Sequence, residues 1–488
     1  MERLRLSRAA LDRFPPAVRV PGYEVASVTP GIVHLGFGGF HRAHMARYTH
    51  DLMERQPAAR NWGIVGAGLL AGDRKMHEAL APQDGLYTLV ERDDRTEKVT
   101  VIGAVAQTIC SADDPSSLLA AIAGRGIRIV SLTVTENGYC LHPATKRLDR
   151  RHEAIAADLE DPMRPHSAIG IIVEAYRQRM ISGRAAFTAL SCDNIPHNGR
   201  VLKDAVLKFA HLRDPGLAGW IAAKARFPST MVDRITPITR PEDTAELAAR
   251  YGVVDNWPVF CEPFSQWVIE DDFADGRPAW ELTGAQFVSD VAPYEFMKLR
   301  LLNASHLAVA GLGRLAGYRF VHETMLDASL RRYMEALMDR ETAPTLPPVP
   351  GVDLAEYKAT LVARFANATI RDTLDRVNAD APVNLLVDPI RERLKADADF
   401  DLLALALAAW FRRVRGTDDA GRPVDVRHPL APLLLEKAIE GGADPRPLLG
   451  IENLFGELGR NERLVSTVGK WLASLYRVGA AGTLRALR

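Results

Sequence analysis

Short runs of β-branched and other apolar residues alternate with longer amphipathic stretches along the first half of the chain. Such runs are typical of buried strands, and they predict strands at residues 31–35, 62–66, 86–91, 127–135 and 186–192. Between them, residues 117–123 and 168–180 carry apolar side chains at helical spacing. Because strands that alternate with helices form a parallel sheet covered on both faces, we predict an α/β domain of the Rossmann type with a doubly wound parallel sheet.

The pattern changes at about Tyr294, after which strand-like runs become rare. Segments rich in Leu, Ala and Arg take over, and residues 330–338 and 400–414 are examples with helical periodicity. Residues 342–351 hold four prolines in ten positions, so we expect a loop there rather than the interior of a helix. The sequence therefore predicts an α/β domain at 1–286 and a mainly α-helical domain at 287–488.

The charge balance excludes one class of partner. The 488 residues include 61 Lys and Arg against 61 Asp and Glu, so the formal net charge is zero. Without an excess of positive charge we expect no nucleic acid partner. Apolar residues at 47% and charged residues at 25% are the usual proportions of globular domains with sizeable cores. The sequence has no coiled-coil seam or long apolar strand edge, and it therefore favours a monomer.

Membrane insertion and secretion are also not expected. No window holds the ~18 uninterrupted apolar residues of a spanning helix. The first residues, MERLRLSRAALDRFPP, are charged and interrupted by proline, so they lack the apolar core of a signal peptide. We therefore expect a soluble, cytoplasmic protein. The four widely spaced cysteines fit neither a disulfide framework nor a Cys-x-x-Cys metal knuckle, and we expect them to be reduced.

A glycine cluster follows the first predicted strand and precedes a helical pattern at 40–52. In a Rossmann-type domain the pyrophosphate of a dinucleotide lies here, against backbone amides. Gly36 and Gly38 match the first two glycines of the dinucleotide fingerprint, whereas the third position is His41. The candidate cofactor-binding residues of this cluster are Gly36, Phe37, Gly38, Gly39, Phe40, His41 and Arg42. The alternative interpretation is a tight turn that holds no ligand.

Asp73 is a further candidate for binding a cofactor, because it follows the second predicted strand. An acidic side chain there suits the ribose hydroxyls of NAD and would repel the additional phosphate of NADP. Asp73 lies 35 residues beyond Gly38, later than the usual ~20. The alternative role for this side chain is a solvated helix cap.

A second group of candidates lies on a helix predicted to start after Pro293. At ~100° per residue, Lys298, Asn303 and His306 share one face with two leucines. Burying such polar groups is costly unless they are hydrogen-bonded or take part in chemistry. A buried lysine also has its pKa lowered toward neutrality, as a general base at pH 7 requires. The alternative is an interdomain face on which Lys298 pairs with a carboxylate and His306 is a hydrogen-bonded core residue.

Three further polar residues are candidates for contacting a substrate. Asn194 and Glu136 stand at the ends of two predicted strands, and the carboxyl ends of parallel strands face the crevice where α/β sheets bind ligands. An Asx-type turn is the alternative role for Asn194. Asp233 lies in the segment MVDRITP, where it could orient a histidine or pair with Arg234.

Several longer blocks of sequence carry a resemblance to a known family. The chain contains, in this order, GIVHLGFGGFHRAH, IVSLTVTENGYC, SCDNIPHNG, FPSTMVDRITP, CEPFSQWVIED and PYEFMKLRLLNASH. These blocks resemble those of the polyol-specific long-chain dehydrogenases, the mannitol dehydrogenase family. The resemblance extends from about Gly31 to Asn367, and the blocks GYRFVHETM and LPPVPGVDL support it.

The resemblance implies a metal-independent reaction that uses NAD to interconvert a polyol and a ketose, with D-mannitol and D-fructose as the expected pair. In the family the lysine of the K-x-x-x-x-N-x-x-H motif is the general acid/base, a role that would fall on Lys298. Glu295 resembles the family's carboxylate that relays the proton to water. The active site is then expected between the two domains.

Other residues would contact the substrate if the resemblance holds. Asn194 and Asn303 would form an oxyanion hole for the developing alkoxide. His306 would orient the substrate hydroxyls, and Asp233 would bind further along the polyol.

One segment departs from the family pattern. After Asn367 the family usually has a short Asp-Gly-Ser-x-Lys segment and a further basic residue, whereas this chain reads RVNADAPVNLL and is shorter. The basic residues contact the far end of the substrate in the family. D-Arabinitol and the pair D-mannonate and fructuronate are therefore alternative substrates, although a uronate needs a cationic partner for its carboxylate.

Two other classes of protein remain as alternatives. One is a noncatalytic nucleotide sensor that kept the fold, against which the joint presence of Lys298, Asn303, His306 and Asn194 argues. The other is a zinc-dependent alcohol dehydrogenase, which requires a Cys/His/Glu set around an open metal position. The sequence has no such ligand spacing, so we expect no metal.

Overall fold

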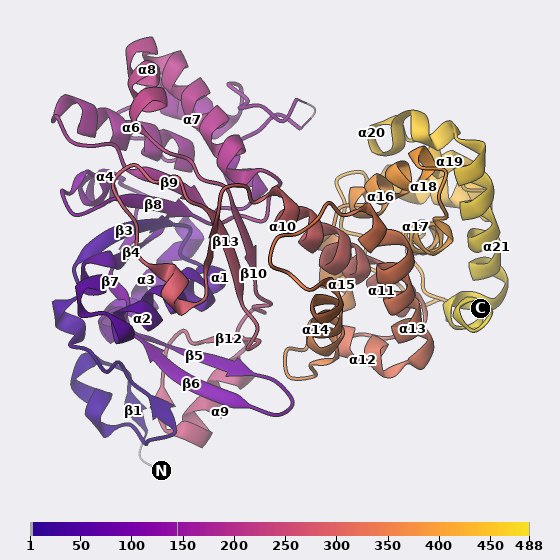
Figure 1. The fold of residues 1–488 in the computed structure, drawn as a ribbon, viewed down its shortest axis with the longest axis horizontal. Helices are drawn as coiled ribbons and strands as arrows, with labels where there is room; N and C mark the ends of the chain where they lie inside the picture. The colour runs from indigo at the N-terminus through magenta and orange to yellow at the C-terminus, as the bar shows by residue number, and fades with distance from the viewer. Residues whose placement is uncertain (1–2, 144, 488) are drawn as a thin grey trace. The chain divides into compact units, whose positions relative to one another are not determined.

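The computed structural model of the chain describes residues 3–143 and 145–487. It divides into two compact units, Met1–Val291 and Ala292–Arg488 (Figure 1). The two units meet after strand β14 (Gln286–Val288). The boundary expected from the sequence, between residues 286 and 287, lies inside this strand. Both units have hydrophobic cores of their own.

A five-stranded parallel sheet lies at the centre of the first unit, in the order β7-β4-β3-β8-β9. Its strands are β3 (Pro30–Leu35), β4 (Gly63–Gly68), β7 (Val105–Cys110), β8 (Ile129–Leu132) and β9 (Thr188–Ser191). The chain moves outward from β3 through β4 to β7, then returns to the other side of β3 for β8 and β9. This order confirms the predicted doubly wound sheet and places its switch point, where such sheets bind ligands, between β3 and β8.

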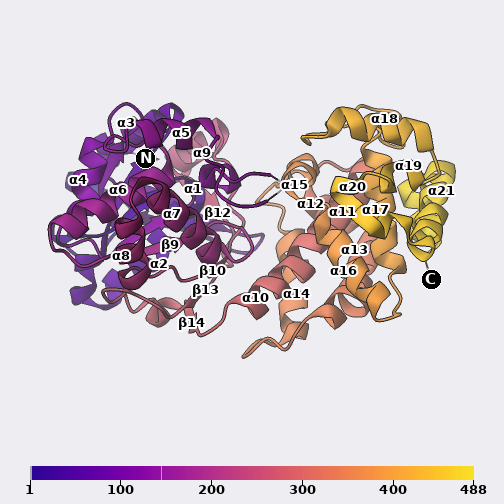
Figure 2. The ribbon, with the colours of Figure 1, turned by 90° about the horizontal axis from the view of Figure 1, so that it is seen from above.

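Alternate residues of the central strands pack into two different cores, as the period-two geometry of a strand requires. Ile32, Ile64 and Ile129 are paired neighbours that face one core together with α2 (Met45–Arg55). The next residue of each strand faces the second core. That core includes α4 (Ser116–Ala123), α6 (Ala168–Ile181), α7 (Asn198–Arg213) and α8 (Pro215–Lys224). Figure 1 shows these helices alongside β8 and β9, and Figure 2 shows the same group from above.

Two predictions for the first unit were partly wrong. The run 86–91 does form a strand, β5 (Tyr87–Arg92), but β5 pairs antiparallel with β6 (Glu97–Ile102) in a separate sheet. The helical pattern at 40–52 is two helices, α1 (Gly39–Ala43) and α2, because His44 leaves the helical conformation at φ −115° and ψ −96°. The break separates the glycine loop from the long amphipathic helix behind it.

Smaller elements complete the first unit. The sheet of β5 and β6 also contains β2 (Val18–Arg19) and β12 (Val259–Cys261). A three-stranded sheet is formed by β10 (Thr230–Asp233), β13 (Gln266–Glu270) and β14, and β1 (Leu4–Arg5) pairs with β11 (Val253–Val254). The remaining helices are α3 (Arg74–Leu80), α5 (Glu153–Glu160) and α9 (Pro241–Tyr251).

Helices build the second unit, as predicted; apart from isolated bridges, its described part contains no strand. They are α10 (Ala292–Met297), α11 (Ala304–Leu315), α12 (Val321–Leu326), α13 (Ala328–Leu337), α14 (Leu354–Ala366), α15 (Leu374–Asp380), α16 (Asn384–Lys395), α17 (Asp401–Arg413), α18 (Ala431–Gly441), α19 (Arg446–Leu449), α20 (Glu452–Phe455) and α21 (Glu462–Arg485). The central helices α11 and α17 are buried on nearly every side, which explains their apolar composition. The proline-rich stretch begins with a short 3-10 turn, Ala343–Thr345, and continues as a loop.

Between α10 and α11 the helix changes its hydrogen-bonding pattern. Residues Lys298–Asn303 form a π-helical segment, in which each amide bonds five rather than four residues back. The prediction of one regular helix through this region was therefore wrong, and the angular positions assigned to its side chains at 100° per residue change with it.

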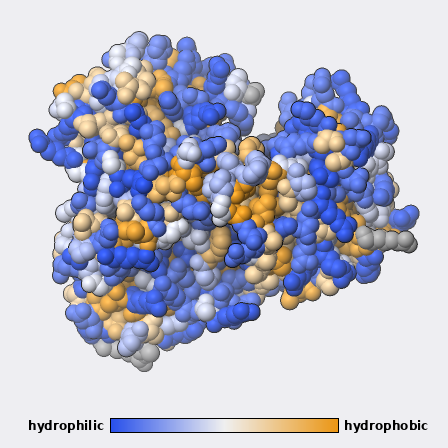
Figure 3. All heavy atoms as spheres, viewed as in Figure 1, coloured by the Kyte–Doolittle hydropathy of each residue, from blue (hydrophilic) through white to orange (hydrophobic). Residues whose placement is uncertain are grey.

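The face of the molecule seen in Figure 3 is largely hydrophilic, with hydrophobic side chains in separate groups. Of the helices in the described residues, none is long and apolar enough to cross a membrane.

Candidate active site

Gly36 begins the candidate cofactor loop, in a conformation that only glycine adopts without strain. Its φ is +81°, and a Cβ built on it would lie 2.2 Å from the carbonyl oxygen of Thr133, which follows β8. The loop is therefore pressed against the neighbouring strand end at the switch point. At Gly38 the nearest atom to a built Cβ is 3.8 Å away, so glycine there leaves open space beside the backbone. Open space beside exposed amides fits a pyrophosphate, whose oxygens accept hydrogen bonds from backbone N–H groups.

Side chains of the same loop point into the unit rather than outward. Phe37 is buried, and its ring fills the space that a Cβ on Gly66 would occupy. Arg42 is buried as well, donates from Nη1 to the carbonyl oxygen of Trp257 at 2.5 Å and lies over the ring of Tyr87. Burial lowers the pKa of Arg42 to about 10. At these positions only the backbone is placed to meet a dinucleotide.

His34 and His41 form a stacked pair beneath the loop, with ring centroids 3.4 Å apart and exposed fractions of 0% and 1%. Thr133 Oγ1 donates its one proton to the Gly36 carbonyl oxygen at 2.9 Å, so the hydroxyl accepts from His34 Nε2. Because Nε2 carries the proton of the neutral ring, His34 Nδ1 accepts from Ser131 Oγ at 2.8 Å. Burial lowers the pKa of His34 to about 3 and that of His41 well below its usual value. Both rings are therefore neutral, and the His34 ring ties β3 to β8 through its two hydrogen bonds.

Asp73 follows β4, the strand next to β3. Its Oδ2 accepts hydrogen bonds from the amides of Leu69 and Leu70, both at 2.9 Å. The side chain is half-buried and closes the turn at the start of a short helix. The capping role proposed as the alternative is thus present, and contact with a ribose remains a prediction.

The buried side chain of Asn198 joins the segment that contains Asn194 to the segment that contains Asp233. Asn198, at the start of α7, donates from Nδ2 to the carbonyl oxygens of Asp193 and Thr230, both at 2.9 Å. Its Oδ1 accepts from the Thr230 amide at 2.9 Å. Asn194 directly follows Asp193, and Asp233 ends β10, the strand that Thr230 begins. The structure therefore fixes the loop of one candidate to the strand of the other.

Glu136 is highly exposed, as Asn194 is, in contrast to the buried Lys298, His306 and Asp233. It forms an ion pair with Lys146 at 3.0 Å, and both side chains are mostly in solvent. The residue before it, Thr135, donates its amide to the Asp193 carboxylate at 2.7 Å, so Glu136 lies beside the same group of loops.

Lys298, Asn303 and His306 lie on the helix of the second unit, with Lys298 and His306 each 8% exposed. A π-helical turn stacks residue i+5 over residue i, so Lys298 and Asn303 come onto one face, whereas an ideal α-helix would separate them by ~140°. Among the described residues Asn303 Oδ1 is buried without a hydrogen-bond partner. This oxygen is able to accept a hydrogen bond from a ligand hydroxyl, and the amide nitrogen of the same side chain is a donor. Glu295, half-buried, lies one turn earlier on α10.

Two residues beside His306 were missed from the sequence. The ring of His306 stacks on Phe365 with centroids 4.5 Å apart, and its Nε2 lies 3.8 Å from Asp372 Oδ2. Arg376 donates from Nε to the same carboxylate at 2.6 Å. Phe365 and Asp372 are far from His306 in sequence. The packing of α14 on α12 and of α15 on α11 brings them near.

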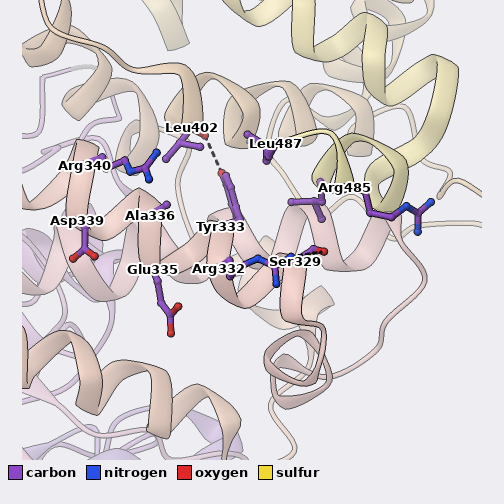
Figure 4. A pocket seen from close by; sticks show the side chains of 11 residues that line it. Ser329, Arg332, Tyr333, Glu335, Ala336, Asp339, Arg340, Leu402, Arg485 and Leu487 are labelled. Carbon is purple, nitrogen blue, oxygen red and sulfur yellow. Dashed lines mark hydrogen bonds between the residues drawn. The ribbon is translucent and has the colours of Figure 1, made fainter.

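A cavity of about 350 Å³ elsewhere in the second unit contains none of the candidate residues. It is lined by Arg332, Arg340, Arg485 and the ring of Tyr333, whose hydroxyl donates to the Leu402 carbonyl oxygen at 2.9 Å (Figure 4). The figure shows the Arg485 side chain directed away from the other labelled residues. This cavity is separate from the candidate site.

Within residues 3–143 and 145–487, no group of three His, Cys, Asp or Glu side chains is arranged to hold a metal ion. The four cysteines are free, and three of them are buried.

The fold and these residues place the protein in a class, the two-domain dehydrogenases in which a Rossmann-type unit is followed by a helical unit. Two family models match the chain, "Mannitol dehydrogenase Rossmann domain" over residues 30–282 and "Mannitol dehydrogenase C-terminal domain" over residues 290–476. The chain belongs to the mannitol dehydrogenase family.

Individual relatives are similar over nearly their whole length. Mannitol 2-dehydrogenase of Aspergillus fumigatus is 41% identical, with 99% of each chain covered, and mannitol dehydrogenase 2 of Saccharomyces cerevisiae is 40% identical, with 98% of this chain and 97% of that protein covered. Among solved structures, mannitol 2-dehydrogenase of Pseudomonas fluorescens in a ternary complex with NAD and D-mannitol superposes with a TM-score of 0.90 at 41% identity, covering 99% of both chains. A substrate-free D-sorbitol dehydrogenase gives a TM-score of 0.89 at 34% identity, covering 98% of this chain and all of that one.

Proposed function

We propose that this protein is an NAD-dependent polyol dehydrogenase that interconverts D-mannitol and D-fructose. One observation supports the proposal: a π-helical turn brings Asn303 toward the face of Lys298, on a helix that also carries His306, in a chain 41% identical to an enzyme solved with NAD and D-mannitol. Similarity to a mannitol 2-dehydrogenase over 99% of both chains argues against a noncatalytic nucleotide sensor.

Lys298 acts as the general acid/base in this proposal. It takes the proton of the reacting hydroxyl as the carbon loses its hydride, and Glu295 relays that proton to water. NAD, when bound, supplies the hydride acceptor. No metal takes part, and activity should survive extensive treatment with a chelator. Loss of activity that added zinc restores would contradict this part of the proposal.

Amide groups stabilise the charge that develops on the substrate oxygen. Asn194 and Asn303 donate hydrogen bonds to the alkoxide, and one such donor can contribute about 3 kcal/mol to the transition state. His306, fixed by its stacking on Phe365, orients the neighbouring hydroxyls. Asp233 and Glu136 accept hydrogen bonds from more distant hydroxyls of the polyol.

The cofactor is assigned to the glycine loop and to Asp73. The open space at Gly38 suits a pyrophosphate, and the second carboxylate oxygen of Asp73 suits a ribose hydroxyl. The negative charge of Asp73 disfavours the additional phosphate of NADP. The expected outcome is a much higher kcat/KM with NAD than with NADP, and a preference for NADP would contradict the assignment.

The charge around His306 favours a neutral substrate over a uronate. Arg376 binds the carboxylate of Asp372, which lies 3.8 Å from His306 Nε2. The positive charge of Arg376 is therefore compensated by Asp372. A carboxylate substrate needs an uncompensated cation. D-Arabinitol remains the alternative, because it differs from mannitol at the end that the shortened segment after Asn367 would contact.

The test is a spectrophotometric assay at the NADH band with purified protein. NAD is offered with mannitol, sorbitol, arabinitol and mannonate, and NADH with fructose and fructuronate. Mannitol and fructose should give the highest kcat/KM. A higher value with arabinitol or with the uronate pair would move the substrate assignment, and no turnover with any of them, despite NADH binding, would favour the sensor.

A further inference from the structure

Asp193 lies between the glycine loop and the substrate candidates, in a ring of hydrogen bonds that no assigned role explains. The Asp193 amide donates to Ser191 Oγ at 3.3 Å, and Tyr139 Oη donates to Asp193 Oδ2 at 2.9 Å. Tyr139 has one proton, which the carboxylate receives, so Ser191 Oγ donates to Tyr139 Oη at 2.6 Å. The three residues therefore close a ring, and all of them are buried.

The carboxylate of Asp193 also accepts from the backbone that follows β8. The Thr135 amide donates to Oδ1 at 2.7 Å, and the Val134 amide donates to Oδ2 at 3.2 Å. Burial raises the pKa of Asp193, while these amides and Tyr139 act against that rise by binding the charged form. A buried carboxylate with its donors aligned in this way is rigid.

Thr135 is held in a conformation that is unusual for its side chain. Its φ is 62° and its ψ is 172°, a region occupied almost only by glycine, and threonine is β-branched. Strain of this kind persists only where the surroundings impose it, and such residues cluster at functional sites. In this conformation the Thr135 amide donates to the Asp193 carboxylate at 2.7 Å.

The segment around Thr135 lies beside the glycine loop and beside two of the substrate candidates. Thr133 contacts Gly36 of the glycine loop, Glu136 follows Thr135, and Asn194 follows Asp193. In a Rossmann fold the second half of the sheet, here β8 and β9, carries the nicotinamide half of the dinucleotide at its carboxyl edge.

We propose that Asp193 is a positioning residue for the reaction: its carboxylate holds Thr135 in the strained conformation and so fixes the β8 loop against the glycine loop and Asn194. The inference rests on the proposed function for its kinetic readout. If Asp193 only stabilised the fold, the effect of removing its carboxylate would not depend on whether residue 135 is strained.

The test is a double-mutant cycle between Asp193→Asn and Thr135→Gly. Asparagine keeps the shape of the carboxylate but cannot accept from all three donors, so kcat with mannitol should fall about 10-fold or more. Glycine adopts φ 62° without strain, so the same change in the Thr135→Gly background should cost much less. Equal losses in both backgrounds would overturn the proposal.

A matched control separates positioning from stability. Asp158 is also buried and accepts from two backbone amides, of His166 at 2.8 Å and Ser167 at 3.0 Å, but it lies on α5 and binds the residues that precede α6. Asp158→Asn should lower the melting temperature while kcat stays unchanged. If Asp193→Asn behaves in the same way, Asp193 is structural and the proposal is wrong.

Tyr139→Phe supplies a second variant in case Asp193→Asn does not fold, because it removes one donor to the carboxylate and keeps the ring packing. A fall in kcat with little change in KM supports positioning, and an unchanged kcat contradicts it.

If the unmodified protein turns over no polyol, the proposed function fails by itself. NADH affinity is then measured in the same four proteins. Asp193→Asn should weaken NADH binding when residue 135 is threonine, and should not weaken it in the Thr135→Gly variant.

Discussion

Lys298 is buried, and the π-helical turn brings Asn303 toward the same face of the helix. We expect turnover to depend on Lys298 more than on any other residue. Lys298→Ala should lower kcat/KM at least ~100-fold, because removal of a general base costs that much. NADH affinity should change little. Lys395→Ala, which removes an exposed lysine at the end of α16, is the matched control and should leave turnover unchanged. Near-normal kcat/KM in Lys298→Ala would refute the mechanism.

Gly36 offers a comparison between two glycines in the left-handed region. Gly36→Ala adds backbone strain at φ +81° and a Cβ 2.2 Å from the Thr133 carbonyl oxygen, whereas Gly183→Ala adds strain at φ +64° with nothing within 4 Å. Both variants should lose about 1 kcal/mol or more of stability from strain. Only Gly36→Ala should also weaken NADH binding, about 10-fold, in a fluorescence titration. Equal NADH affinities in the two variants would argue against a cofactor at this loop.

At the scale of elements, α17 is held at its amino end by Glu341. The carboxylate accepts from the amides of Leu402 at 2.8 Å and Leu403 at 2.7 Å, and burial raises its pKa to about 7. A pKa raised by folding favours the folded state fully below the unfolded value near 4.5 and loses that contribution as the pH rises through 7. The second unit should therefore lose on the order of 2 kcal/mol of stability between pH 5 and pH 8.

Urea unfolding at several pH values measures this slope. Glu341→Gln carries no titrating carboxyl group and should flatten it, while Glu356→Gln, an exposed glutamate in the first turn of α14, should leave it in place. An identical slope in Glu341→Gln and the unmodified protein would assign the pH dependence to another group.

Elements with strong local signals could be predicted from the sequence. The central strands were found because burial on both faces leaves near-continuous apolar runs, as in β3 and β4. The partner of β5 could not be found, because pairing with β6 depends on where the chain turns and not on the apolar run itself. The π-helical turn was missed because apolar spacing fits an α-helix nearly as well over so few residues.

For the candidate site, the sequence predicted individual residues but not the directions of their side chains or their partners. Lys298, Asn303 and His306 stand out as polar residues among leucines, but the inward direction of the His41 and Arg42 side chains depends on tertiary packing. Asp193 and Asp372 carry no local signal, since ordinary surface aspartates look the same in sequence. Their roles depend on partners such as Tyr139 and His306, which lie more than 50 residues away.

At the scale of the whole molecule, equal numbers of acidic and basic residues leave no net charge to drive association with a polyelectrolyte. We expect a monomer, so light scattering at micromolar concentration should give a mass near 53.6 kDa. The mass should not change when NADH is added. A mass of twice this value at the lowest concentration that supports activity would contradict the expectation.

The π-helical turn at Lys298–Asn303 also determines which kinds of sequence change the protein can accept. A π turn contains one residue more than an α turn, so the alignment of Lys298 with Asn303 is encoded in the number of residues and not only in their identities. Apolar neighbours such as Leu299 and Leu301 can be exchanged for residues of similar volume. Deletion or insertion of a single residue would rotate all that follows by ~100° about the helix axis. Evolution and engineering of this segment are therefore restricted to substitution.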